Sequence, residues 1–128
     1  MKKVILFVLV FMSQAVWADV SPLSVVNERM RAYNEHDIES FLKVYSEEIQ
    51  IFTYPNEPLG KRGKEHLKKI FGPMFEEGNV SVAIHEQIVQ GKYVINHETV
   101  TYAGKAQKYV SIYEVEGGTI KSVQFIRE

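Results

Sequence analysis

Apolar and polar positions divide the chain into a helical first part and a sheet-forming second part. Between residues 21 and 75, apolar residues mostly recur three or four positions apart, which is typical of amphipathic helices. The pattern predicts one helix from Ser21-Pro22 to residues 34–36, a second from Asp37 and a third from Gly63. A strand is predicted at residues 49–54, and Pro73 is expected to kink or break the third helix.

From residue 80 onward, β-branched and aromatic residues dominate four segments. These predicted strands are residues 80–88, 93–102, 108–116 and 119–126. The glycines between them predict hairpin turns. Because the helices come first and an antiparallel meander follows, the expected class is α+β, with one curled sheet packed on three N-terminal helices.

The N-terminus has the order of segments of a secretory signal peptide. Lys2 and Lys3 form a basic start, residues 4–12 are uniformly apolar, and a polar-to-small tail ends with Val16 and Ala18 at the expected cleavage site. The alternative is an uncleaved membrane anchor, but the run is short of the roughly 20 residues that span a bilayer. The predicted division is a signal peptide at 1–18 and one domain at 19–128. No cysteine is present for lipid attachment, so we expect an exported protein, periplasmic or secreted, with no membrane attachment after cleavage.

Charge and composition exclude several classes of function. The chain has 15 basic and 16 acidic residues, and loss of Lys2 and Lys3 leaves 13 basic residues and a net charge of −3. This balance argues against a nucleic-acid partner, which requires a basic surface. The four histidines fall on separate segments, so no metal site and no cofactor are expected. His85 and His97 are expected to be cross-strand neighbours on the outer face of the sheet.

Three segments resemble a known superfamily. They are AYNEHDIESFLKVYSEEIQIF, GKEHLKKIF and VSIYEVEGGTIKSVQFI. Together they are similar to the nuclear transport factor 2-like superfamily, and within it to SnoaL-like and ketosteroid-isomerase-like proteins. The resemblance covers residues 23–126. It implies a cystatin-like cone, in which a curled, mostly antiparallel sheet and three helices enclose a pocket, and it suggests a homodimer.

The catalytic groups of the steroid isomerases are not matched. Those enzymes use a carboxylate base together with a tyrosine and a protonated carboxylic acid. Aligned segment by segment, the three positions are occupied here by Tyr54, Arg29 and Ser111. Steroid isomerase chemistry by that mechanism is therefore not expected.

The same alignment implies which strand residues face the pocket, because neighbours along a strand face opposite sides. Phe52 and Tyr54 are expected to face inward, as are alternate residues from Val94 to Tyr102. The implied pocket is aromatic and aliphatic with a few polar groups, which suits a small hydrophobic or aromatic molecule. The predicted ligand-binding residues are Tyr33, Phe52, Tyr54, Phe71, Asn96, Val100, Ser111, Tyr113 and Phe125.

Glu98 is the candidate catalytic residue. A carboxylate that faces an apolar cavity is suited to general acid or base catalysis. The alternative places Glu98 at the rim of the pocket, in an ion pair with Arg127, Arg29 or Lys121. Three functions stay open: a binding protein, an isomerase, dehydratase or cyclase that uses Glu98, and a dimeric interaction module whose outer sheet face presents apolar residues.

Overall fold

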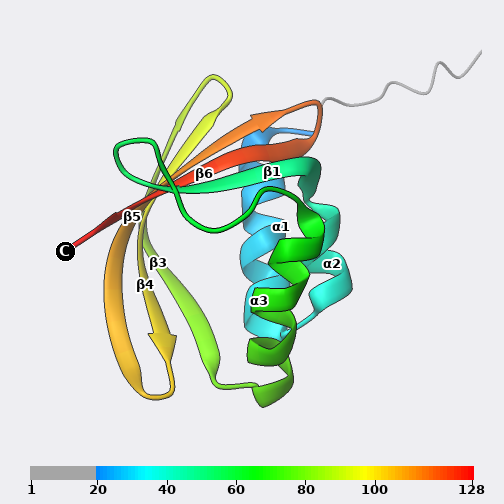
Figure 1. Cartoon of the computed structure of the whole chain (residues 1–128). Coiled ribbons are helices and arrows are strands. Elements are labelled where there is room, and N and C mark those ends of the chain that lie inside the picture. Colours follow the sequence, from blue (N-terminus) through cyan, green and yellow to red (C-terminus); the bar gives the residue numbers. More distant parts are fainter. Residues whose placement is uncertain (1–19) are drawn as a thin grey trace, which may run out of the picture.

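The computed structural model describes residues 20–128, and the predicted signal peptide lies outside them. Figure 1 shows the helices packed together against one side of a strongly curved sheet. The helices are α1 (Pro22–Glu35), α2 (Ile38–Lys43) and α3 (Lys64–Glu77). The strands are β1 (Tyr45–Thr53), β2 (Glu57–Pro58), β3 (Val80–Gln90), β4 (Tyr93–Tyr102), β5 (Lys105–Glu116) and β6 (Thr119–Arg127).

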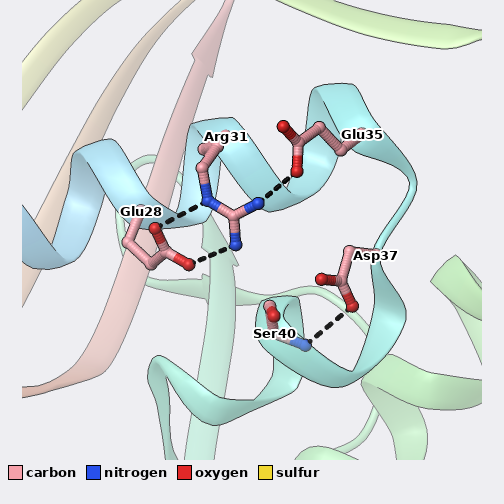
Figure 2. A network of polar contacts seen from close by, with 5 residues as sticks. All are labelled: Glu28, Arg31, Glu35, Asp37 and Ser40. Carbon is pink, nitrogen blue, oxygen red and sulfur yellow. Dashed lines mark hydrogen bonds and ion pairs between the residues drawn. The ribbon is translucent and has the colours of Figure 1, made fainter.

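The predicted starts of the first two helices are confirmed by their caps. The Ser21 hydroxyl accepts a hydrogen bond from the backbone N–H of Ser24 at 3.2 Å, ahead of Pro22 at the first helical position. At the end of α1, His36 adopts a left-handed conformation with φ of 57°. Asp37 then caps α2, because its carboxylate accepts from the backbone N–H of Ser40 at 3.1 Å (Figure 2). The chain thus reverses between α1 and α2 within two residues.

Helix α3 continues through Pro73, so the break that was one of the two predicted outcomes does not occur. The helix continues to Glu77 and ends at Gly78, which has a left-handed φ of 70°. A proline inside a helix costs about 3 kcal/mol or more. Phe71 and Phe75 pack into the core on either side of the proline, and this burial keeps both halves of the helix in place.

The sheet has six strands in the order β2-β1-β6-β5-β4-β3. The antiparallel meander β3 to β6 is confirmed, and β1 adds to β6 in parallel, so the sheet is mixed. The hairpins turn at glycines with positive φ, such as Gly91 at 56° and Gly104 at 79°.

The pairing of β1 with β6 is irregular, and this changes which β1 residues face inward. Tyr45 pairs with Ile120, but Gln50 pairs with Ser122, so five steps along β1 match two along β6. Such an irregularity reverses the alternation of faces beyond it. Ile51 is consequently buried.

The predicted inward orientation of Phe52 and Tyr54 is therefore wrong. Tyr54 is 54% exposed and Phe52 is half-buried. At the far end of β4, Tyr102 was also expected to face inward and is 44% exposed. The inward orientation of Val94, Asn96 and Glu98 agrees with their burial.

The core lies between the helices and the concave face of the sheet. Helix α1 packs against β3, β4, β5 and β6, while α3 packs against α2 and β1. Four rings fill the space between the helices, with neighbouring centroids 4.9 to 6.3 Å apart and mostly tilted or edge-on contacts. They are Tyr33, Phe41, Phe71 and Phe75.

Candidate functional site

A cavity of about 240 Å³ lies between α1, α3 and the inner face of the sheet. A cavity of about 150 Å³ is enough for benzene, and ordinary ligand pockets measure about 300–1,000 Å³. The cavity therefore has room for one ring with a short substituent. Its apolar lining is Tyr33, Leu59, Phe71, Val100, Tyr109 and Phe125. Its polar lining is Arg29, Thr53 and Arg127.

Three larger depressions on residues 20–128 are more open to solvent than this cavity and do not have the character of a ligand pocket. One of about 740 Å³ runs along α2 and α3 and includes the exposed Lys68 and Glu76. Another, about 680 Å³, is lined mostly by charged side chains such as Arg62 and Lys121, and a third of about 380 Å³ lies beside α1 and α2. The smaller cavity is more enclosed and has a largely apolar wall, so it is the candidate site.

Arg29 is the most unusual residue of the cavity, because it is a charged side chain that is only 4% exposed. Its Nε donates a hydrogen bond of 2.5 Å to the hydroxyl of Tyr45. Its guanidinium carbon lies 5.2 to 5.7 Å from the ring centroids of Tyr33, Phe41 and Tyr113, which are cation–π distances. The charge is thus held by a hydroxyl and three rings.

Arg29 has no ion pair within residues 20–128, since no carboxylate oxygen there lies within 4.0 Å of its nitrogens. Burial alone lowers the pKa of Arg29, but nearby Tyr113, Tyr45 and Glu98 together hold it above the usual value. The guanidinium is therefore charged at any pH at which the protein is folded.

The phenols around Arg29 remain protonated at neutral pH. Burial raises the pKa of Tyr113 well above its usual value of 10.0, although the charge of Arg29 opposes this. Burial also raises the pKa of Tyr45 and of Tyr33, again against the influence of Arg29. These hydroxyls act as hydrogen-bond donors or neutral acceptors.

Glu98 is buried behind the cavity wall and does not line the cavity. It is 1% exposed. Ser111 donates to its Oε1 at 2.7 Å, and Tyr113 donates to both oxygens at 3.1 and 3.4 Å. Asn96 donates to Oε2 at 3.4 Å. Each carboxylate oxygen is thus already occupied by donors from the protein.

The predicted rim position of Glu98 is wrong. Glu98 lies on β4, inside the sheet, and Tyr113 separates it from Arg29: the Tyr113 ring stacks on the guanidinium and its hydroxyl binds the carboxylate. No ion pair joins Glu98 to Arg127, Arg29 or Lys121. The order from the cavity inward is therefore Arg29, Tyr113 and Glu98.

A row of amides continues from Glu98 to the surface. The Asn96 side-chain oxygen accepts from Gln87 Nε2 at 3.0 Å, and the same nitrogen donates to Asn27 Oδ1 at 3.1 Å. Asn27 is exposed. Both ends of the Asn96 amide are therefore occupied by protein groups.

The predicted ligand-binding residues fall into three groups. Four line the cavity, namely Tyr33, Phe71, Val100 and Phe125. Three are buried in the polar cluster behind the wall, namely Asn96, Ser111 and Tyr113. Phe52 and Tyr54 do not line the cavity, because β1 presents Thr53 there instead. The binding roles of the first four residues stay predictions.

Sequence reasoning missed Arg29 as a lining residue, although a signal was present. Arg29 interrupts the apolar stripe of the first helix, since it lies four residues after Val25 and four before Tyr33. Position 29 must therefore face the core if the helix is amphipathic. Tyr109 lies two positions before Ser111, and Arg127 lies two positions after Phe125. Residues two positions apart face the same side of a strand, so this spacing also puts Tyr109 and Arg127 on the inner side.

The histidine pair lies apart from this site. His85 and His97 are neighbours, with ring centroids 5.4 Å apart, as predicted. His85 Nε2 is 2.7 Å from the Thr99 hydroxyl. Within residues 20–128, no group of three or more histidine, cysteine or acidic side chains is arranged to hold a metal ion. In the same range, no helix is both long enough and apolar enough to cross a membrane.

Comparison with known proteins agrees with this architecture. A family model described as SnoaL-like domain matches residues 26–123. No curated protein gave a significant match. A cystatin-fold protein from Novosphingobium aromaticivorans has a TM-score of 0.76 at 22% identity, covering 84% of this chain and 98% of its own.

Two further solved structures are similar in fold. A nuclear transport factor 2-like (NTF2-like) protein of unknown function from Cytophaga hutchinsonii has a TM-score of 0.73 at 18% identity, covering 84% of this chain and 90% of its own. An LEH-like epoxide hydrolase from M. tuberculosis has a TM-score of 0.69 at 14% identity, covering 87% of this chain and 85% of its own. At such identities these similarities show the fold, and the fold hosts more than one function.

Proposed function

Because the chain belongs to the SnoaL-like family, we propose that it binds a small hydrophobic or aromatic molecule in the cavity between the sheet and the helices. The observation that carries the proposal is the cavity of about 240 Å³, whose wall is largely apolar and includes the rings of Tyr33, Phe71, Tyr109 and Phe125. Aromatic walls with a few polar groups are typical of small-molecule sites.

Binding without turnover is favoured over acid–base catalysis by Glu98. A general acid or base must reach its substrate within hydrogen-bond distance, directly or through one water. Glu98 is 1% exposed, lies behind Arg29 and Tyr113, and already accepts from three protein donors. The alternative, an isomerase, dehydratase or cyclase, would require this cluster to open.

The proposed site is testable with a neutral aromatic probe. Indole is titrated into the ¹⁵N-labelled protein, and the expected amide shift changes are concentrated at Phe71, Val100 and Phe125. Val100→Phe narrows the cavity and should abolish them. Val89→Phe, the same substitution at a position that is 45% exposed on β3, should leave them unchanged. Shift changes spread over the surface, or equal in both variants, would reject the cavity as the site.

A second proposal concerns a homodimer through the outer face of the sheet. The strand register places Ile88, Ile95 and Ile112 side by side on β3, β4 and β5. Ile88 is 58% exposed, so the row ends in an apolar surface residue. Light scattering should give twice the protomer mass, and Ile112→Glu should give the single mass. A monomeric wild type would refute the dimer.

We also propose that the protein is exported, on the strength of the signal-peptide pattern in residues 1–18. Expression of the full chain in a bacterium should release a periplasmic protein that begins at Asp19. N-terminal sequencing and intact mass measure this directly. Recovery of the uncut chain from the membrane fraction would contradict it.

A further inference from the structure

The cavity has two polar groups from α1 that make no side-chain hydrogen bond within the described part of the chain. Within residues 20–128, the side-chain hydrogen bonds of Arg29 use Nε and Nη1, and Nη2 makes none. Tyr33 is also only 4% exposed, and its hydroxyl takes part in none of the side-chain hydrogen bonds of that range. Both residues line the cavity.

These two groups must face the open space. In the described range, every side-chain nitrogen or oxygen that is fully buried has a hydrogen-bond partner. Among residues 20–128, Nη2 of Arg29 and the hydroxyl of Tyr33 have none, so neither is fully buried, although both side chains are almost completely enclosed. Both side chains line the cavity, so we infer that these two atoms face it. They lie one helical turn apart, and the guanidinium carbon is 5.7 Å from the Tyr33 ring centroid.

The electrostatics of the lining favour an anion. Both charged residues that line the cavity are arginines, namely Arg29 inside and the exposed Arg127 on β6. The one buried carboxylate nearby, Glu98, has its oxygens occupied by Ser111, Tyr113 and Asn96. Arg29 therefore keeps donor capacity that no carboxylate of the described chain uses.

We propose that the ligand is a small aromatic carboxylate, whose carboxylate accepts hydrogen bonds from Arg29 Nη2 and the Tyr33 hydroxyl while its ring lies among the aromatic side chains of the cavity. This deepens the proposed function and rests on it. Guanidinium and hydroxyl donors suit a carboxylate, and hydrogen bonds to an ionised group are the stronger ones. The volume suits a single ring with a short acidic arm.

The test compares phenylacetate with phenylacetamide, which has a similar shape without the charge. Affinities are measured by isothermal titration calorimetry or from NMR shift changes. In the wild type, the acid should bind at least about tenfold more tightly than the amide. In Tyr33→Phe, which keeps the ring, the preference for the acid should fall about fivefold or more, and in Arg29→Gln it should vanish.

Matched controls use the same substitutions outside the cavity. Tyr54→Phe and Arg31→Gln alter exposed side chains that do not line it, and they should leave the preference unchanged. Arg29→Gln perturbs a buried cluster and could fail to fold. Tyr33→Phe and the ligand pair in the wild type keep the proposal testable in that case.

The outcomes separate this inference from the proposed function. Equal binding of acid and amide would overturn the anionic ligand and leave the hydrophobic site intact. A preference that survives Tyr33→Phe but is lost in Arg127→Gln would place the anion at the mouth, and it would also overturn the inference. Failure of phenylacetate, phenylacetamide and indole alike to bind would instead refute the proposed function.

Discussion

Two arginines on the same helix hold their charge in opposite ways. Arg31 lies on the solvent face of α1, where it binds Glu28 at 2.5 and 2.8 Å and also Glu35 (Figure 2). Arg29, two residues earlier, is 4% exposed and has a tyrosine hydroxyl and three aromatic rings as neighbours. The helical period places two arginines that are two positions apart on opposite sides of α1, one in the core and one at the surface.

The difference shows which of the two arginines can contribute to ligand binding. The partners of Arg31 are exposed to water, which replaces them at little cost, because exposed ion pairs contribute little to stability. The partners of Arg29 are fixed by the fold, so its removal leaves them unsatisfied. Only Arg29 retains a donor that faces a cavity, which is why the binding hypothesis rests on it.

The largest expected loss of stability follows from the substitution of Arg29. Arg29→Ala should lower the free energy of unfolding by about 3–5 kcal/mol, because it creates a cavity and removes the positive charge near Glu98. Urea unfolding followed by circular dichroism measures this. Arg31→Ala is the matched control on the other face of the helix. Equal losses in the two variants would show that burial does not distinguish the two arginines.

The second largest loss of stability is expected from the substitution of Glu98. Glu98→Gln should lower the free energy of unfolding by about 2–3 kcal/mol, because the new amide NH₂ replaces one oxygen and must face a donor, the Ser111 hydroxyl on the Oε1 side or Asn96 Nδ2 on the Oε2 side. Glu114→Gln is the control, since Glu114 is half-buried and pairs with Lys92 at the surface at 2.8 Å. The double variant with Arg29→Ala should lose less than the sum of the single losses. Strict additivity would disprove the coupling.

A smaller effect is expected at alkaline pH. Burial raises the pKa of Tyr113 and of Tyr45 in the folded state, so their contribution to stability is present below the unfolded value of 10.0 and is lost as the pH rises above it. Each tyrosine contributes a slope of up to about 1.4 kcal/mol per pH unit. Urea unfolding from about pH 8 to 11 should give a shallower decline in Tyr113→Phe. Equal slopes would contradict the assignment to Tyr113.

The smallest effect is on the surface network. Arg31→Ala should leave the free energy of unfolding unchanged within error, yet it should raise the pKa of Glu28. The hydrogen bond from Arg31 is the main cause that holds this pKa below its usual value. NMR titration of the Glu28 carboxyl carbon measures the change. An unaltered Glu28 titration would mean that the pair in Figure 2 does not persist in solution.

Much of the local structure could be predicted because it depends on neighbours in the chain. The Ser21 and Asp37 caps act on residues three positions away. The glycine turns set the hairpins of the meander, and alternation along β4 correctly placed Asn96 and Glu98 inside. The α+β arrangement followed from this order of elements together with the family resemblance.

The predictions that failed depend on contacts between distant segments. Phe52 and Tyr54 were misplaced because five steps of β1 pair with two of β6, and the partner strand lies about seventy residues away. The low helix propensity of proline favoured a break in α3, but the burial of Phe71 and Phe75 keeps the helix continuous across Pro73. The depth of Glu98 behind the cavity wall was not predicted, because alternation gives the face of a residue but not its depth.

By itself, the sequence determined the helices, the turns, the order of strands and the fact that Arg29 interrupts an apolar stripe, since each depends on spacing over a few residues. Only the tertiary structure decided that Arg29 and Tyr33 face a small cavity while Glu98 lies behind it. That outcome depends on how α1 crosses four strands of a curved sheet. The depth of a side chain below the surface depends on the residues that pack over it, and these residues come from distant parts of the chain.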